Sequence, residues 1–167
     1  IVSTIGLSVI GQTGNLVPAD KKIYALRDVT GTVDNVSLIA GSIMSKKIAA
    51  GSDAIVLDVK VGTGAFMKDV EHAEALARMM VDIGNQAGRK TVAFVTDMNQ
   101  PLGDAVGTAL EVKEAIEILH GKHLSDLRTV AVRLASQMLV LGGIIDTEEE
   151  AAAACEASLE EGTALGK

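Results

Sequence analysis

The apolar positions along the chain divide it into strands and helices. Two short runs rich in β-branched residues, 53–61 (DAIVLDVKV) and 91–96 (TVAFVT), are typical of buried parallel strands. Between them, residues 70–87 carry apolar side chains at helical spacing and end at Gly88. Strand, helix and strand in this order form a βαβ unit. We therefore predict an α/β fold with a largely parallel sheet flanked by helices.

Further helices are predicted on both sides of this unit. They cover residues 21–28, 37–50, 107–119, 124–141 and 147–159. The first of them is entered at Pro18 with Asp20 as a possible N-cap, and the last has Asp146 or Thr147 as its N-cap. Residues 7–10 are expected to form a strand that leads into a turn at 11–14.

Composition and charge narrow the classes of function. Apolar residues make up 48% of the chain but aromatic residues only 2%, so the core must be built from aliphatic side chains and methionine. The net charge of −7 argues against a nucleic-acid partner, although it allows a local anion site. Without a membrane-length apolar run or a signal peptide, we expect a cytoplasmic protein with no membrane partner. The chain begins at Ile1 inside an apolar segment, which suggests a fragment of a longer enzyme.

A charged and polar set of side chains precedes the first predicted strand. Ser42 and Lys46 are four residues apart, so a hydroxyl and an ammonium share one helix face, and Arg27 stands in the preceding helix. These donors could converge on a small ligand rich in carbonyl oxygens. The alternative is a solvated basic end of a helix.

Other candidate groups allow two interpretations each. The loop Gly62-Thr63-Gly64 could offer backbone N–H groups to a phosphate, or could be a tight turn that ends a strand. Oxygen atoms from Asp97, Asn99, Glu114 and the loop 102–105 could bind a hard cation, or could be solvated polar groups. The remaining candidates show no catalytic or metal-binding pattern: His72, His120, His123 and Cys155.

Three segments give a specific resemblance. Residues 24–47 (YALRDVTGTVDNVSLIAGSIMSKK), 47–67 (KIAAGSDAIVLDVKVGTGAFM) and 96–116 (TDMNQPLGDAVGTALEVKEAI) resemble the thymidine and pyrimidine-nucleoside phosphorylase family. The similarity extends over essentially the whole chain. The segment IMSKKIAAGSDAIVLDVK is more similar to the broad-specificity pyrimidine-nucleoside enzymes of Gram-positive bacteria than to the thymidine-restricted branch.

The resemblance implies a pentosyltransferase of nucleoside salvage. Such an enzyme uses phosphate as co-substrate and converts uridine, thymidine or deoxyuridine to free base and (deoxy)ribose 1-phosphate. The family also implies a homodimer with its active site between a small helical lobe and a larger α/β domain. Residues 1–18 would start the α/β domain, 19–50 would be a helical-lobe segment that carries the base contacts, and 51–167 would be part of the α/β domain.

The resemblance also implies roles for individual residues. Arg27, Ser42 and Lys46 would hold the pyrimidine ring, with Tyr24 and Ile39 close by. Arg27 and Lys46 would stabilise the negative charge that develops on the departing base. A structural potassium ion would take carbonyl oxygens and one carboxylate from Leu102, Ala105 and Glu114.

The match to the family has departures. Gly31, Gly41 and Asn35 differ from the family pattern at positions without an expected ligand contact, and the two glycines are expected to loosen their helices. The family's phosphate-binding segment is not in this chain, so we expect it to carry the base-binding half and to be inactive alone. The alternatives are a phosphoribosyltransferase of the anthranilate phosphoribosyltransferase type and a non-catalytic binding module. The former should show an acidic magnesium motif, and no adjacent acidic pair precedes Glu148.

Overall fold

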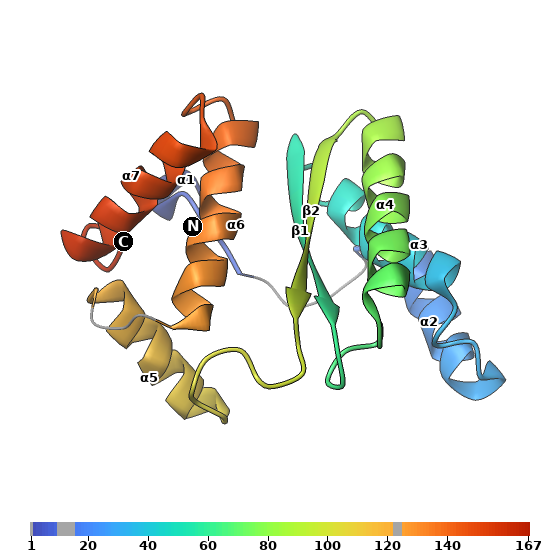
Figure 1. Cartoon of the computed structure of the whole chain (residues 1–167). Helices are drawn as coiled ribbons and strands as arrows, with labels where there is room; N and C mark the ends of the chain where they lie inside the picture. The colour runs from blue at the N-terminus through green and yellow to red at the C-terminus, as the bar shows by residue number, and fades with distance from the viewer. Residues whose placement is uncertain (1, 10–15, 122–124) are drawn as a thin grey trace.

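A computed structural model describes residues 2–9, 16–121 and 125–167 of the chain. Its elements, in chain order, are α1 (Val2–Ile5), α2 (Pro18–Thr30), α3 (Val36–Ala49), β1 (Ala54–Val61), α4 (Val70–Gln86), β2 (Lys90–Asp97), α5 (Thr108–Leu119), α6 (Asp126–Leu141) and α7 (Glu148–Glu160). Figure 1 shows the two strands in the middle, with α3 and α4 on one side and α6 and α7 on the other. The predicted α/β fold is confirmed.

The two strands pair in parallel, as the βαβ pattern predicts. The register runs from Ala54 opposite Lys90 to Val61 opposite Asp97, and α4 makes the connection between the strands. Both strands therefore end at the same edge of the sheet. Loops that follow the carboxyl ends of parallel strands are where α/β proteins place ligands.

The main core lies between the sheet and the helices α3 and α4. Alternate residues of β1 point into it and contact small or flexible side chains of both helices: Ile55, Leu57, Val59, Ile39, Ala40, Met44, Leu76, Ala77 and Met80. None of these side chains is aromatic, so the helices pack close to the strands. Because α3 shares this core, the residues around Ser42 and Lys46 are fixed relative to β1.

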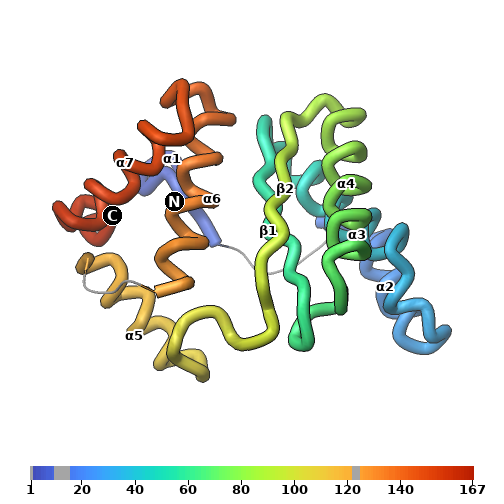
Figure 2. The backbone as a smooth tube through the Cα atoms, viewed as in Figure 1, coloured from blue at the N-terminus to red at the C-terminus, as the bar shows by residue number. Residues whose placement is uncertain are grey.

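The second face of the sheet meets α6, which pairs with α7. Arg128 on α6 is 6% exposed, and its guanidinium donates to the carboxylate of Glu156 on α7 and to the carbonyl oxygen of Gly121. Figure 2 shows α5, α6 and α7 grouped on this side of the strands, away from α2. This ion pair thus joins α6 to α7 on the side of the sheet opposite α3 and α4.

Side-chain caps explain where four of the helices begin. Asn35, Asp69, Ser125 and Thr147 each accept a hydrogen bond from a backbone N–H in the first turn of the following helix. Of the two N-cap candidates for α7, the structure thus selects Thr147. The departure at Asn35 is explained in the same way, because asparagine is a strong N-cap.

The structure corrects the expected strand at 7–10 for the residues that it describes. Residues 2–5 form the short helix α1, which Gly6 ends with a φ of 91°, and residues 7–9 belong to no strand. Leu7 and Val9 are exposed and pair with no other strand, so their alternation alone gives no sheet. The expected turn at 11–14 lies outside the described residues.

Two expectations about α2 are also wrong. Asp20 is not its N-cap: the helix begins two residues earlier, at Pro18, and Val17 stands at the cap position without a side-chain bond. Proline suits a first turn because its missing N–H has no partner there in any case. Gly31 does not loosen the helix but follows it in the left-handed conformation, with a φ of 66°.

The division into a smaller lobe at 19–50 and an α/β domain stays a prediction. Among the described helices, none is long and apolar enough to cross a membrane.

Candidate functional site

Arg27 lies in the last turns of α2 with only 4% of its surface exposed. Its guanidinium donates to the backbone carbonyl oxygens of Thr32 and Leu38, both at 3.4 Å, and to that of Val33. The ring of Tyr24, one turn earlier, lies 5.1 Å from the guanidinium carbon. Arg27 therefore holds the connection between α2 and α3, and stacking on Tyr24 fixes the plane of its fork.

Lys46 is surrounded by acceptors. Its ammonium lies 2.6 Å from Oδ2 of Asp20, 2.7 Å from the carbonyl oxygen of Ser42 and 2.9 Å from the Ser42 hydroxyl. The spacing of Ser42 and Lys46 on α3 thus gives the shared face that the sequence predicts. The side chain of Lys46 is 26% exposed and that of Asp20 is 10% exposed, so the ion pair is largely removed from water.

The charge of Asp20 is stabilised by its neighbours. Burial alone raises the pKa of its carboxyl group. The hydrogen bond from Lys46, the nearby Ser42 hydroxyl and the positive charges of Lys46 and Arg27 outweigh this effect, and the net result is a lowered pKa. Asp20 is therefore an anion at neutral pH, close enough to both cations to interact with each.

We call Asp20, Arg27, Ser42 and Lys46 the polar cluster. Ser42 and Lys46 are in direct contact, while Arg27 is linked to them through the effect of its charge on Asp20, an aspartate that the sequence had placed at a helix cap. A signal for it exists: Asp20, Tyr24 and Arg27 are spaced i, i+4 and i+7, so they lie on one face of α2.

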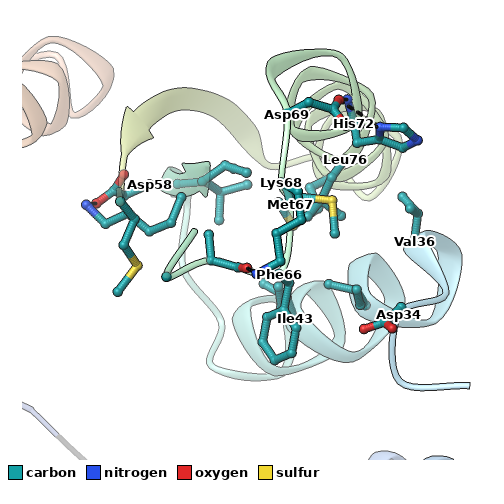
Figure 3. A pocket seen from close by; sticks show the side chains of 18 residues that line it. Asp34, Val36, Ile43, Asp58, Phe66, Met67, Lys68, Asp69, His72 and Leu76 are labelled. Atoms are coloured by element: carbon teal, nitrogen blue, oxygen red, sulfur yellow. Dashed lines mark hydrogen bonds and ion pairs between the residues drawn. The ribbon is translucent and has the colours of Figure 1, made fainter. Parts of the chain in front are cut away.

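Ile39 is the fifth predicted contact residue. It is 8% exposed and lines a cavity of about 810 Å³ between α3, the end of β1 and the start of α4. Figure 3 shows labelled side chains of Val36, Ile43 and Phe66 around this cavity. Phe66 is 64% exposed, and the sequence reasoning did not single it out. The sequence feature that could have pointed to Phe66 is an aromatic residue, rare in this chain, a few positions after a buried strand.

Charged side chains lie at the rim of the same cavity. Lys68 donates to the carbonyl oxygens of Thr63 and Ala65, at 3.1 and 2.7 Å. His72 lies 2.7 Å from Asp69 through Nδ1, and this hydrogen bond raises the pKa of His72. The histidine is in the first turn of α4, as expected, and has a capping aspartate as its partner.

The loop Gly62-Thr63-Gly64 is a tight turn. Its three backbone N–H groups donate to the Met67 carbonyl, the Asn99 side-chain oxygen and the Met98 carbonyl, respectively. A Cβ on Gly62 would stand 2.7 Å from Oδ1 of Asn99, which explains the glycine. Because these donors are used within the protein, the phosphate-binding interpretation of this loop is wrong.

Glu114, on α5, is 7% exposed. Its carboxylate accepts hydrogen bonds from the backbone N–H groups of Asp104 at 2.8 Å and of Ala105 at 3.2 Å. Asp97 and Asn99 bond to each other instead, and Asn99 also bonds to Thr63. Glu114 is thus the acidic partner of the loop that contains Leu102 and Ala105.

A monovalent cation would fit these residues chemically. Within residues 2–9, 16–121 and 125–167, Glu114 has no cationic side chain within ion-pair distance, although it is buried. Each carboxylate oxygen keeps a second lone pair after accepting one N–H. In the same described ranges, no three His, Cys, Asp or Glu side chains gather as a metal site. A hard ion held by the carbonyl oxygens of Leu102 and Ala105 together with Glu114 stays a prediction.

The remaining candidates have structural surroundings. His120 is the C-cap of α5, as its position before a helix stop suggests. Cys155 lines an apolar groove between α5, α6 and α7, where burial raises the pKa of its thiol and keeps it protonated. His123 lies outside the described residues.

The parallel sheet and its covering helices define an α/β protein, and the largely shielded polar cluster lies on α2 and α3, while the cavity is lined by other residues. The sequence pattern of the "glycosyl transferase family, a/b domain" matches residues 1–165. The chain belongs to this family.

Two curated relatives show the closeness of the match. A pyrimidine-nucleoside phosphorylase of Staphylococcus haemolyticus (strain JCSC1435) is 60% identical over 167 residues, which are 100% of this chain and 39% of the relative. One of Staphylococcus aureus (strain bovine RF122 / ET3-1) is 59% identical over the same shares. The chain thus spans 39% of the length of these relatives.

Proposed function

We propose that the chain carries the base-binding half of a pentosyltransferase for pyrimidine nucleosides. The reaction is phosphorolysis of uridine, thymidine or deoxyuridine to free base and (deoxy)ribose 1-phosphate, in nucleoside salvage. Membership of the glycosyl transferase family supports glycosyl transfer over a binding module, and the names of the relatives support a nucleoside phosphorylase over a phosphoribosyltransferase. A cytoplasmic homodimer is the assembly that we infer for the longer enzyme.

The observation that carries the proposal is the contact of Ser42 and Lys46 on α3, with Asp20 of α2 joined to Lys46 and under the influence of the Arg27 charge. A guanidinium, a hydroxyl and an ammonium match the carbonyl oxygens and the ring N–H of a pyrimidine imide. Ile39, on the same helix as Ser42 and Lys46, lines the cavity and would supply an apolar wall for the flat ring. Side chains that bind polar edges and apolar faces together are typical of small-molecule sites.

The chemistry follows from where charge develops. Breaking the N-glycosidic bond leaves an electron pair on the ring nitrogen, and the carbonyl oxygens of the base share the negative charge. Fixed cations at those oxygens stabilise the transition state more than the ground state. Arg27 and Lys46 are held in place by protein acceptors before any ligand arrives, so their positive charges are already fixed in direction.

Two further groups complete the proposal. Phosphate is the co-substrate, and its binding residues are expected outside this chain, so the chain alone would not catalyse phosphorolysis. Leu102 and Ala105 would offer carbonyl oxygens and Glu114 its carboxylate to a potassium ion, which would tie the loop after β2 to α5.

Calorimetry with uracil and thymine tests the proposal. The unaltered chain should bind both bases. Arg27→Ala and Lys46→Met should each weaken binding about tenfold or more, the loss typical of a charge-assisted hydrogen bond. Arg78→Ala, an exposed arginine on α4, is the control and should bind normally. Equal binding by the Arg27 and Lys46 variants would reject the site, and turnover of uridine by the chain alone would reject its inactivity.

A further inference from the structure

We infer that Asp20 is a positioning and specificity-determining residue, which makes the polar cluster accept a neutral ring with carbonyl groups and reject an anion. The inference rests on the proposed function, because it takes the cluster as the place where the base binds. It assigns to Asp20 a role other than the helix cap that its position suggests.

The first step is the occupancy of the Lys46 ammonium. This group has three N–H donors, and the structure gives it three acceptors: Oδ2 of Asp20, the Ser42 carbonyl oxygen and the Ser42 hydroxyl. A base oxygen can therefore reach Lys46 only by replacing one of them. The carboxylate bond is charge-assisted and the shortest, and the carbonyl belongs to the helix backbone. The hydroxyl can rotate away, so it is the acceptor that a ligand replaces.

The second step is the orientation that follows. With the Ser42 hydroxyl displaced, Lys46 is still held between Asp20 on α2 and the backbone of α3. Its free N–H then points where the hydroxyl had been. The released hydroxyl stays next to the same position and can bond to the ring edge. Asp20 thus fixes the direction in which Lys46 donates, which a lysine on its flexible stem cannot do by itself.

The third step is the charge balance. Arg27 and Lys46 contribute two positive charges and Asp20 one negative charge, so the cluster carries a net charge of +1. Without Asp20, the two cations would attract any small anion, including the phosphate that the proposed reaction consumes. A carboxylate within contact distance of Lys46 repels an anion at that point. A neutral imide has no such penalty, so the pair selects the base.

Binding of three probes at constant ionic strength tests this selectivity: uracil, orotate (the same ring with a carboxylate) and inorganic phosphate. Asp20→Asn keeps an acceptor for Lys46 but removes the charge. We expect uracil to bind about tenfold more weakly and both anions roughly tenfold more tightly. Asp82→Asn changes the net charge equally at an exposed position of α4 and should alter none of these affinities. Asp20→Glu restores the charge and should again reject the anions.

A second measurement needs no variant of Asp20. The chain is labelled with ¹⁵N-lysine, and the ammonium resonance of Lys46 is assigned as the one that is missing in Lys46→Arg. In the unaltered chain this resonance should be protected from hydrogen exchange at neutral pH. Uracil should shift it and phosphate should not. If uracil does not bind, the proposed function is rejected. The charge role of Asp20 is kept in that case if the unaltered chain excludes the anions and Asp20→Asn binds them. Unchanged anion affinity in Asp20→Asn, or a Lys46 resonance that responds to phosphate, would overturn the inference.

Discussion

A side chain on Gly103 would collide with the carboxylate of Glu114: a Cβ built on Gly103 would stand 2.7 Å from Oε2. Glu114 also accepts the N–H groups of the next two residues, so the carboxylate fits against the bare backbone of this loop. The loop follows β2, at the carboxyl edge of the sheet. Glycine is required at this position for close approach as well as for its φ of 79°.

Replacing Gly103 by alanine should therefore destabilise the chain twice, by backbone strain and by displacing Glu114. Gly143→Ala is a matched control, since Gly143 has a φ of 67° and open space around its Cβ position. We expect Gly143→Ala to cost about 1 kcal/mol and Gly103→Ala to cost about 1–3 kcal/mol more. Urea unfolding of both variants measures the difference, and equal losses would show that the contact with Glu114 is unimportant.

A potassium dependence is the expected sign of an ion at Glu114. Ligands that bind only the folded chain raise its apparent stability. The midpoint of thermal unfolding should thus rise when choline chloride is replaced by potassium chloride at equal ionic strength, and Glu114→Gln should abolish the rise. Glu149→Gln, at an exposed position of α7, serves as the control. A potassium effect of equal size in the Glu114 variant would place the ion elsewhere.

Two helical glycines, Gly41 exposed and Gly84 buried, should respond to replacement by alanine with opposite changes in stability. Gly41 lies on the exposed side of α3 with nothing within 4 Å of its Cβ position, so Gly41→Ala should stabilise the chain by about 0.5–1 kcal/mol. A Cβ on Gly84 of α4 would stand 2.0 Å from the Thr91 hydroxyl, so Gly84→Ala should separate helix and strand and destabilise. Chemical denaturation tests both signs.

These contrasts show what the sequence could predict. The βαβ unit was readable because two short β-branched runs flank a segment with apolar residues at helical spacing. A cap at Asp146 or Thr147 was readable from local chemistry, and the structure selects Thr147. Contacts between segments that are far apart in the sequence could not be predicted in this way. Asp20 meets Lys46, 26 positions away, through the packing of α2 against α3, and no local pattern records that distance. The strand expected near Leu7 failed for the same reason, because a strand needs a partner.

The ion pair of Asp20 should make stability depend on pH in the acid range. The pKa of Asp20 is lowered in the folded chain, so folding is favoured above the ordinary aspartate value of about 3.9 and this contribution is lost as pH falls through the lower folded value. The difference in unfolding free energy between the unaltered chain and Asp20→Asn should be constant at neutral pH and shrink below about pH 4. A difference that stays constant into strong acid would contradict the lowered pKa.

The ion pair of His72 and Asp69 should give a pH dependence of stability opposite to that of Asp20. The hydrogen bond to Asp69, followed by the charge of that carboxylate, raises the pKa of His72 above its ordinary value of about 6.5. A raised folded pKa means that the pair contributes stability at low pH and loses it as pH rises through the folded value. NMR titration of the His72 ring should give a midpoint above about 6.5.

Asp69→Asn should return the midpoint toward that value while preserving the N-cap of α4, since asparagine also caps helices. Because both side chains are more than half exposed, salt should weaken the shift. An unchanged midpoint in Asp69→Asn would mean that Glu71 or the helix, and not Asp69, sets the protonation of this histidine.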